Sequence, residues 1–161
     1  MNIGIDMMGG DFAPLEAVKG VQLYLSGHNI PAKLTLIGNK EQLEKLVTEH
    51  QTSLENITIV HAEQVIGMHE HPTKALKEKQ QSSIAIGFQL LASGKMDAFI
   101  SAGNTGAMLV GALFSIKALD GVIRPTISSI IPKSEGGTGL LLDVGLNADC
   151  KPEQLNQFAI M

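Results

Sequence analysis

The residues best suited to bind a ligand or take part in a reaction lie in the segment SAGNTGA at 101–107. An apolar run at 97–100 precedes it and a long apolar run follows it, which predicts a strand, a tight loop and a helix. The first amides of such a helix have no intrahelical partner, and glycines let a ligand oxygen approach the backbone closely. We therefore expect an anion site that binds phosphate. The alternative is a plain turn in which Asn104 or Thr105 only caps the helix.

Two further segments place polar residues where predicted strands end, DMMGGD at 6–11 and DVGLNADCKP at 143–152. Loops that follow parallel strands lie on one edge of an open sheet, where ligands bind. We expect all three segments at that edge, which favours a small-anion enzyme over a structural explanation. Carboxylates there would repel phosphate, so they could instead orient lysines, cap helices or bind a cation. The four carboxylates concerned are Asp6, Asp11, Asp143 and Asp149.

Positive charge comes from the polar first half of one long helix, predicted over 73–93 after Pro72. A solvated helix end is the alternative explanation of this charge. Arg124, in GVIRP, adds a fixed positive charge for which a surface ion pair is the alternative. The polar residues on the first turns of the helix are Lys74, Lys77, Lys79, Ser82 and Ser83.

The elements that must position these residues alternate between strand and helix. This alternation predicts an α/β fold with three layers, in which helices cover both faces of a mainly parallel sheet. A hairpin of two strands joined by KSEGG interrupts the alternation as an appendage. The helix that begins near Thr105 is apolar nearly all round, which predicts burial within the domain or against a partner subunit. Strands are expected at 2–6, 33–38, 57–61, 97–100, 126–132 and 138–144, and helices at 14–26, 41–50, 73–93, 105–119 and from 152 onward.

The composition limits the class of protein. The chain has 161 residues, 44% of them hydrophobic, which suits a single α/β domain with a sizeable core. Its net charge of −4 argues against nucleic acid as a partner. The single cysteine, Cys150, excludes an internal disulfide and fits a reducing cytoplasm, and His61, His69 and His71 lack the spacing of metal ligands.

The ends of the chain carry two further expectations. The N-terminus has no signal-peptide pattern, and no run approaches the ~20 apolar residues of a membrane span. The chain stops at Met161 inside a predicted helix, without a capping residue or polar tail. We therefore expect 1–161 to be a fragment of a longer protein.

Several motifs together resemble one enzyme family, the PlsX-type phosphate acyltransferases of phospholipid synthesis. The likeness runs through the whole chain in the same order and covers about the first half of the family's usual length. Two features depart from the family: Lys77-Glu78-Lys79 replaces a common Arg-Arg-Lys, and Met7 and Leu146 replace alanines. The motifs are DMMGGDFAP at 6–14, HPTKALKEKQQSS at 71–83, SAGNTGA at 101–107, GVIRP at 121–125 and LLDVGLNADCKPEQL at 141–155.

The resemblance implies an enzyme that makes acyl phosphate from a long-chain acyl-acyl-carrier-protein and inorganic phosphate. We assign no metal and no cofactor. It also implies an isopropylmalate-dehydrogenase-like fold, a homodimer, and a cytoplasmic location with peripheral membrane association through the missing half. An acidic acyl carrier protein would need a local basic patch. The candidates for that patch are Lys74, Lys77, Lys79 and Lys133.

The chemistry requires no enzyme nucleophile, because the phosphate dianion attacks a thioester readily and a thiol leaves readily. Our hypothesis is direct displacement, with the amides of 103–106 holding phosphate, basic side chains balancing its charge, and an N–H or Asn donor stabilising the oxyanion. Cys150 is then a small packed residue. The expected catalytic residues are Asn104, Thr105, Lys77 and Lys79, and the expected substrate or phosphate ligands are Asp6, Gly9, Gly10, Asp11, Ser82, Ser83, Ser101, Gly103, Gly106, Arg124, Asp143, Gly145, Asn147 and Asp149.

Three alternative functions remain open from the sequence. The first is a phosphotransacetylase-like enzyme that uses a coenzyme A thioester. The second is a nicotinamide-binding dehydrogenase, which is weakened because neither glycine loop reads GxGxxG with an acidic residue ~20 residues later. The third is a half that binds phosphate without catalysis.

Overall fold

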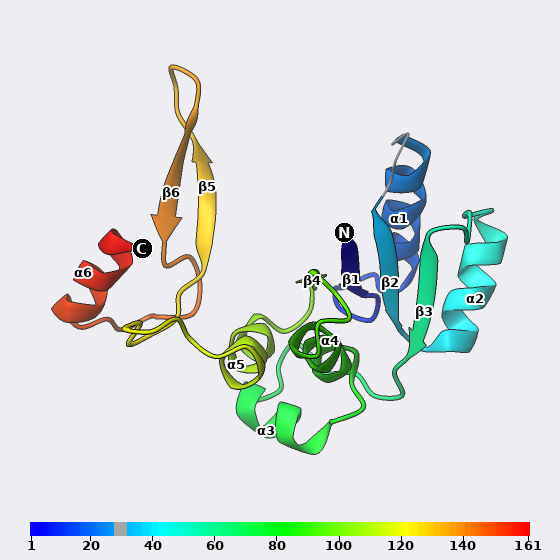
Figure 1. Ribbon diagram of the computed structural model, residues 1–161, viewed down its shortest axis with the longest axis horizontal. Helices are drawn as coiled ribbons and strands as arrows, with labels where there is room; N and C mark the ends of the chain where they lie inside the picture. Colours follow the sequence, from blue (N-terminus) through cyan, green and yellow to red (C-terminus); the bar gives the residue numbers. More distant parts are fainter. Residues whose placement is uncertain (28–31) are drawn as a thin grey trace. The chain divides into compact units, whose positions relative to one another are not determined.

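The computed structural model describes residues 1–27 and 32–161 (Figure 1). The chain divides into two compact units, Met1–Ile116 and Lys117–Met161. The first unit contains the segments DMMGGD and SAGNTGA, and the second contains DVGLNADCKP.

A four-stranded parallel sheet forms the centre of the first unit. Its central strand, β1, pairs with β2 on one side and β4 on the other, with Ile3 opposite both Leu34 and Ala98. The bounds predicted for the first three strands are confirmed. In the spatial order β3-β2-β1-β4, the strands are β3 (Ile57–His61), β2 (Lys33–Gly38), β1 (Asn2–Asp6) and β4 (Ala98–Ile100).

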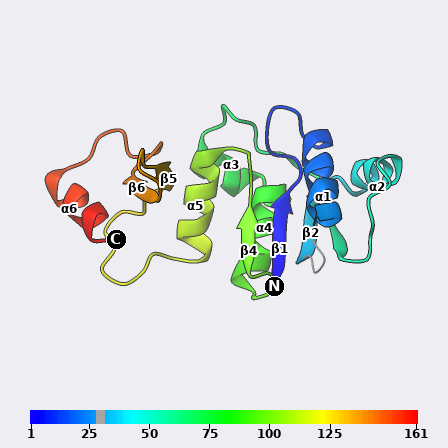
Figure 2. The same cartoon turned by 90° about the horizontal axis from the view of Figure 1, so that it is seen from above.

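Helices cover both faces of this sheet, as the alternating pattern predicts. Successive residues of a strand point to opposite faces. Leu36 of β2 therefore shares a core with α1 and α2, whereas the next residue, Ile37, packs with residues of α4 on the other face. Figure 2 shows α5 beside α3 and α4. The helices of this unit are α1 (Leu15–Gly27), α2 (Lys40–Glu49), α3 (Pro72–Glu78), α4 (Ser83–Ala92) and α5 (Thr105–Ser115).

Close packing of α4 on the sheet depends on Gly87. A Cβ atom at this position would lie 2.2 Å from Cζ of Phe99, a residue of β4. The Phe99 ring in turn meets the Phe88 ring edge to face, with 5.3 Å between the ring centroids. The glycine therefore lets the helix approach the strand that leads into SAGNTGA.

The prediction of one long helix over 73–93 is wrong, because two helices meet there at a break. The Lys79 amide closes α3 on the Ala75 carbonyl, at 2.8 Å, and Ser82 caps α4 by accepting from the Ala85 amide at 3.3 Å. A serine side chain accepts best from a free helical amide when it stands just before the helix. Ser82 therefore marks the start of a new helix.

The helix α5 is shorter than predicted, since it ends at Ser115 and not near 119. Only Ala107 and Gly111 are buried in it, on the face toward α3 and α4. Phe114 has 70% of its surface exposed in the described part of the chain. Burial of the whole helix, inside the domain or against a second subunit, stays a prediction.

The second unit contains the predicted hairpin and one helix. The strands β5 (Ser128–Pro132) and β6 (Thr138–Leu142) pair antiparallel in a two-stranded sheet of their own, which confirms the hairpin. The helix α6 spans Pro152–Ile160. Throughout residues 1–27 and 32–161, every helix is too short or too polar to cross a membrane.

Candidate functional site

The loops after β1 and β4 meet at the carboxyl edge of the sheet. Asp6, the last residue of β1, is 3% exposed. Its Oδ1 accepts from the Met8 amide at 3.0 Å, and its Oδ2 accepts from the Ser101 hydroxyl at 2.6 Å. The Ser101 oxygen also accepts from the Gly103 amide at 2.9 Å. Two of the three predicted segments therefore lie side by side, and Asp6 holds both loops in the first unit.

Gly9 sits at the closest approach of these two loops. A Cβ atom at Gly9 would lie 2.5 Å from the Gly103 nitrogen and 2.8 Å from the Gly103 Cα. Gly10 follows with a positive φ of 105°, a conformation that favours glycine. Asp11 is exposed and forms no ion pair within the described residues.

The first turn of α5 contains backbone amides without a hydrogen-bond partner among the described residues. Oδ1 of the cap residue Asn104 accepts from the Ala107 amide at 2.9 Å. The Thr105 and Gly106 amides have no hydrogen-bond partner in the described part of the chain. Free amides at the positive end of a helix dipole suit an anion. Asn104 thus caps the helix, and two backbone donors remain unpaired within the described residues; that the turn also binds phosphate stays a prediction.

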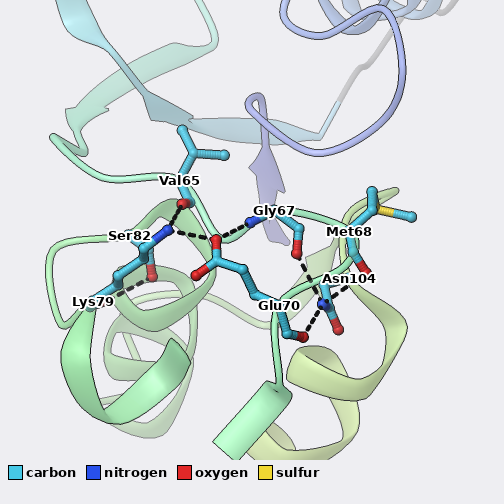
Figure 3. A network of polar contacts seen from close by, with 7 residues as sticks. All are labelled: Val65, Gly67, Met68, Glu70, Lys79, Ser82 and Asn104. Carbon is cyan, nitrogen blue, oxygen red and sulfur yellow. Dashed lines mark hydrogen bonds and ion pairs between the residues drawn. The ribbon is translucent and has the colours of Figure 1, made fainter. Parts of the chain in front are cut away.

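The Asn104 side chain is also committed through its nitrogen (Figure 3). Nδ2 donates to the carbonyls of Gly67, Met68 and Glu70 at 3.0, 3.3 and 3.1 Å. The side chain is buried, at 5% exposure. In this conformation Asn104 can therefore offer a phosphate or an oxyanion only its backbone amide.

The expected lysines differ in how free their charges are. Lys79 Nζ lies 2.5 Å from Glu70 Oε1 and donates to the Val65 carbonyl at 2.7 Å. The hydrogen bonds from Lys79 and from the Gly67 amide hold the pKa of Glu70 below its ordinary value, so the carboxylate stays ionised. The positive charge of Lys79 is thereby balanced by Glu70 within the protein.

Lys77, in contrast, is exposed and forms no ion pair with the described residues. It borders a cavity of about 380 Å³ between α3, α4 and α5, which Phe88 and Phe114 also line. The charge of Lys77 is therefore unpaired within the described residues, and it lies beside a hollow lined partly by aromatic rings.

The predicted serine ligands are buried in the helix break. Ser82 has 0% and Ser83 1% of its surface exposed. The Ser82 hydroxyl donates to the Lys79 carbonyl at 2.7 Å while its oxygen caps α4. In this conformation the structure gives Ser82 a capping role, and neither serine faces solvent.

The expected residues of the second unit form a turn of their own. Asp143 Oδ1 accepts from the Gly145 and Leu146 amides at 2.7 and 3.1 Å, and Oδ2 accepts from Asn147. Burial raises the pKa of Asp143, but these hydrogen bonds outweigh it and hold the pKa below its ordinary value. Nδ2 of Asn147 also donates to the Pro125 carbonyl at 3.1 Å.

Two more residues complete this turn. Arg124 donates to the Asp149 carbonyl at 3.5 Å, and the half-buried Cys150 donates through Sγ to the Asn147 carbonyl at 3.3 Å. That the turn joins the edge of the first unit's sheet stays a prediction.

The comparison with known proteins decides the family. The family model described as "Fatty acid synthesis protein" matches residues 1–161. The chain belongs to this family. The resemblance drawn from the five motifs is thereby confirmed, since its curated relatives carry the name phosphate acyltransferase.

Three of these relatives show how far the likeness extends. The phosphate acyltransferase of Thermoanaerobacterium thermosaccharolyticum is 47% identical over 161 residues, which cover 100% of this chain and 46% of the relative. The proteins of the same name from Dictyoglomus turgidum and Geobacter sulfurreducens are 45% and 43% identical, over 47% and 46% of their lengths and all of this chain. The chain thus spans about half the length of the curated relatives it matches.

Sequence reasoning missed one residue of this family member's site region, Glu70. Its side chain contacts Lys79, nine residues later, across a helix boundary that the sequence pattern did not reveal. The one available signal was Ser82-Ser83, a capping pattern whose recognition would have split the helix and placed Lys79 in a turn.

Proposed function

We propose that the full-length protein is a phosphate acyltransferase that transfers a long-chain acyl group from acyl carrier protein to inorganic phosphate, at the start of phosphatidic acid synthesis. The observation that carries this proposal is the open first turn of α5, where the Thr105 and Gly106 amides are free. The name of the relatives, phosphate acyltransferase, indicates phosphate and an acyl donor as substrates.

The reaction that fits these residues is direct displacement. An oxygen of the phosphate dianion attacks the thioester carbon, a carbon–oxygen bond forms, and the carbon–sulfur bond breaks as the thiolate leaves and takes up the proton that the phosphate hydroxyl loses. The amides of α5 hold and aim the phosphate, and the helix dipole favours its charge. A backbone amide serves as the oxyanion donor. Lys77 lines a cavity with Gly111 and Phe114, beside the later turns of α5, so its role as a counter-charge to the phosphate stays a prediction.

Three further properties belong to this proposal and rest on the family resemblance. They are a homodimeric assembly, a cytoplasmic location, and peripheral contact with the membrane through the half of the protein beyond this chain. Arg124 and the Asp143 turn are proposed as further phosphate ligands.

The test is a donor comparison with the full-length protein. Long-chain acyl-acyl-carrier-protein and acyl-coenzyme A are each incubated with inorganic phosphate, and acyl phosphate is trapped as a hydroxamate. We expect the carrier-protein thioester to give the higher kcat/KM. A preference for the coenzyme A thioester would favour the phosphotransacetylase-like alternative, and no product from either donor would refute the proposal.

Direct displacement makes a separate prediction about Cys150. Incubation with the acyl donor in the absence of phosphate leaves the protein unmodified, because no side chain takes the acyl group. An intact-mass increase that maps to Cys150 would contradict this mechanism.

A further inference from the structure

A polar network joins the segment before α3 to the first turn of α5 (Figure 3). Glu70 is at its centre, because both its side chain and its backbone take part. The carboxylate accepts from the Gly67 amide at 2.6 Å and from Lys79 at 2.5 Å, while the Glu70 carbonyl accepts from Asn104 at 3.1 Å. One residue thus connects the end of α3 with the cap of α5.

Lys79 holds the other end of the same segment. Its ammonium donates to the Val65 carbonyl as well as to Glu70, so the segment 65–70 is fixed at both ends by one charge. This segment has no helix or strand of its own to keep its shape. The Glu70–Lys79 pair therefore helps to fix the conformation of a segment that has no helix or strand.

The segment in turn fixes the orientation of Asn104. Because Asn104 is buried, its side-chain nitrogen needs protein acceptors while its oxygen caps α5. The carbonyls of Gly67, Met68 and Glu70 are those acceptors. Loss of these carbonyls would leave a buried amide nitrogen unsatisfied and favour rotation of Asn104 away from the Ala107 amide.

We propose that Glu70, paired with Lys79, is a positioning residue for phosphate, an inference that rests on the function proposed above. The pair holds the segment 65–70, the segment holds Asn104, and Asn104 keeps the first turn of α5 in the geometry that leaves the Thr105 and Gly106 amides open. Glu70 does not touch the substrate, and Lys79 contributes through this pair and not as a phosphate ligand.

The test uses the full-length protein with Glu70→Ala, Glu70→Gln, Lys79→Met and the double variant Glu70→Ala/Lys79→Met. Glu16→Gln is the matched control, because it removes an exposed ion pair of 2.7 Å, Glu16–Lys19, on α1. The measurements are the KM for phosphate, the KM for the acyl donor, kcat, and equilibrium binding of inorganic phosphate by calorimetry. Thermal unfolding is recorded for each variant.

We expect Glu70→Ala to raise the KM and the Kd for phosphate by about tenfold, below the roughly hundredfold that a 1 Å misplacement can cost. The KM for the acyl donor stays within about twofold of the wild type. Glu70→Gln gives a smaller rise, because its amide oxygen still accepts from Gly67. The double variant behaves like Glu70→Ala alone, because both substitutions break the same Glu70–Lys79 ion pair.

A folded Glu70→Ala variant with wild-type affinity for phosphate would overturn the inference. An equal rise in both KM values, or a lower unfolding temperature without a change in phosphate affinity, would also overturn it as a merely structural effect. If Glu70→Ala does not fold, the same criteria apply to Glu70→Gln and Lys79→Met. The two proposals can fail separately. The phosphate affinity of the variants tests the positioning role, whereas a wild-type protein that binds phosphate but makes no acyl phosphate would refute the function.

Discussion

The substitution Gly9→Ala tests the contact between the two loops of the candidate site. The new Cβ would lie 2.5 Å from the Gly103 nitrogen and 2.6 Å from Asp6 Oδ2, whereas ordinary contact begins at 3.4 Å. Both neighbours are fixed, one as backbone and one as a buried carboxylate that holds Ser101. The loops must therefore separate by roughly 1 Å, which we expect to lower kcat/KM by about a hundredfold and stability by about 1–3 kcal/mol.

The assay compares the full-length Gly9→Ala variant with Gly20→Ala. Gly20 lies in the interior of α1 and has no atom within 4 Å of an added Cβ, so this control should keep its activity and gain up to ~1 kcal/mol of stability. Denaturant unfolding and the KM for phosphate are measured for both variants. Wild-type activity and stability in Gly9→Ala would refute the reasoning, because they would show that the close approach is not required.

Two further predictions concern the packing and the charge of the first unit. Gly87→Ala places a Cβ 2.2 Å from the Phe99 ring and should lower the free energy of unfolding by about 1–3 kcal/mol, so an unchanged denaturation midpoint would contradict the close packing of α4 on β4. The hydrogen bond from Lys79, and then that from Gly67, depresses the folded-state pKa of Glu70 below its ordinary value of 4.5, so its contribution to stability is present above about pH 4.5 and is lost as the pH falls through the folded pKa. The unfolding temperature of the wild type should therefore exceed that of Glu70→Gln by a margin that shrinks in acid. A margin that stays constant with pH would contradict this assignment.

Local pattern was sufficient for much of the first unit. The apolar runs of β1, β2 and β3 gave correct bounds, although only β1 and β2 have a neighbouring strand on either side. SAGNTGA was correctly predicted as a turn from strand to helix. The helix break at Ser82 was missed because the helical spacing of Ile84, Phe88 and Leu91 was extended backwards across a capping serine. Periodicity alone does not show where a helix begins.

The role of Asn104 could not be predicted in the same way. Its side chain is positioned by three carbonyls that lie 34 to 37 residues earlier in the chain. A backbone carbonyl is present at every residue, so no residue type marks those partners in the sequence. The capping half of its role, in contrast, is local and follows from its place before a helix.

The hydrogen bond between Asp6 and Ser101 has a consequence for synthesis of the protein. It joins residues 95 positions apart, so the site cannot assemble until the ribosome has released the chain through β4. Contacts of such long sequence separation form slowly, because the entropy of loop closure must be overcome first. A nascent chain that has completed β1, β2 and β3 already has most of the sheet, yet the two loops of the candidate site cannot meet before its fourth strand is complete.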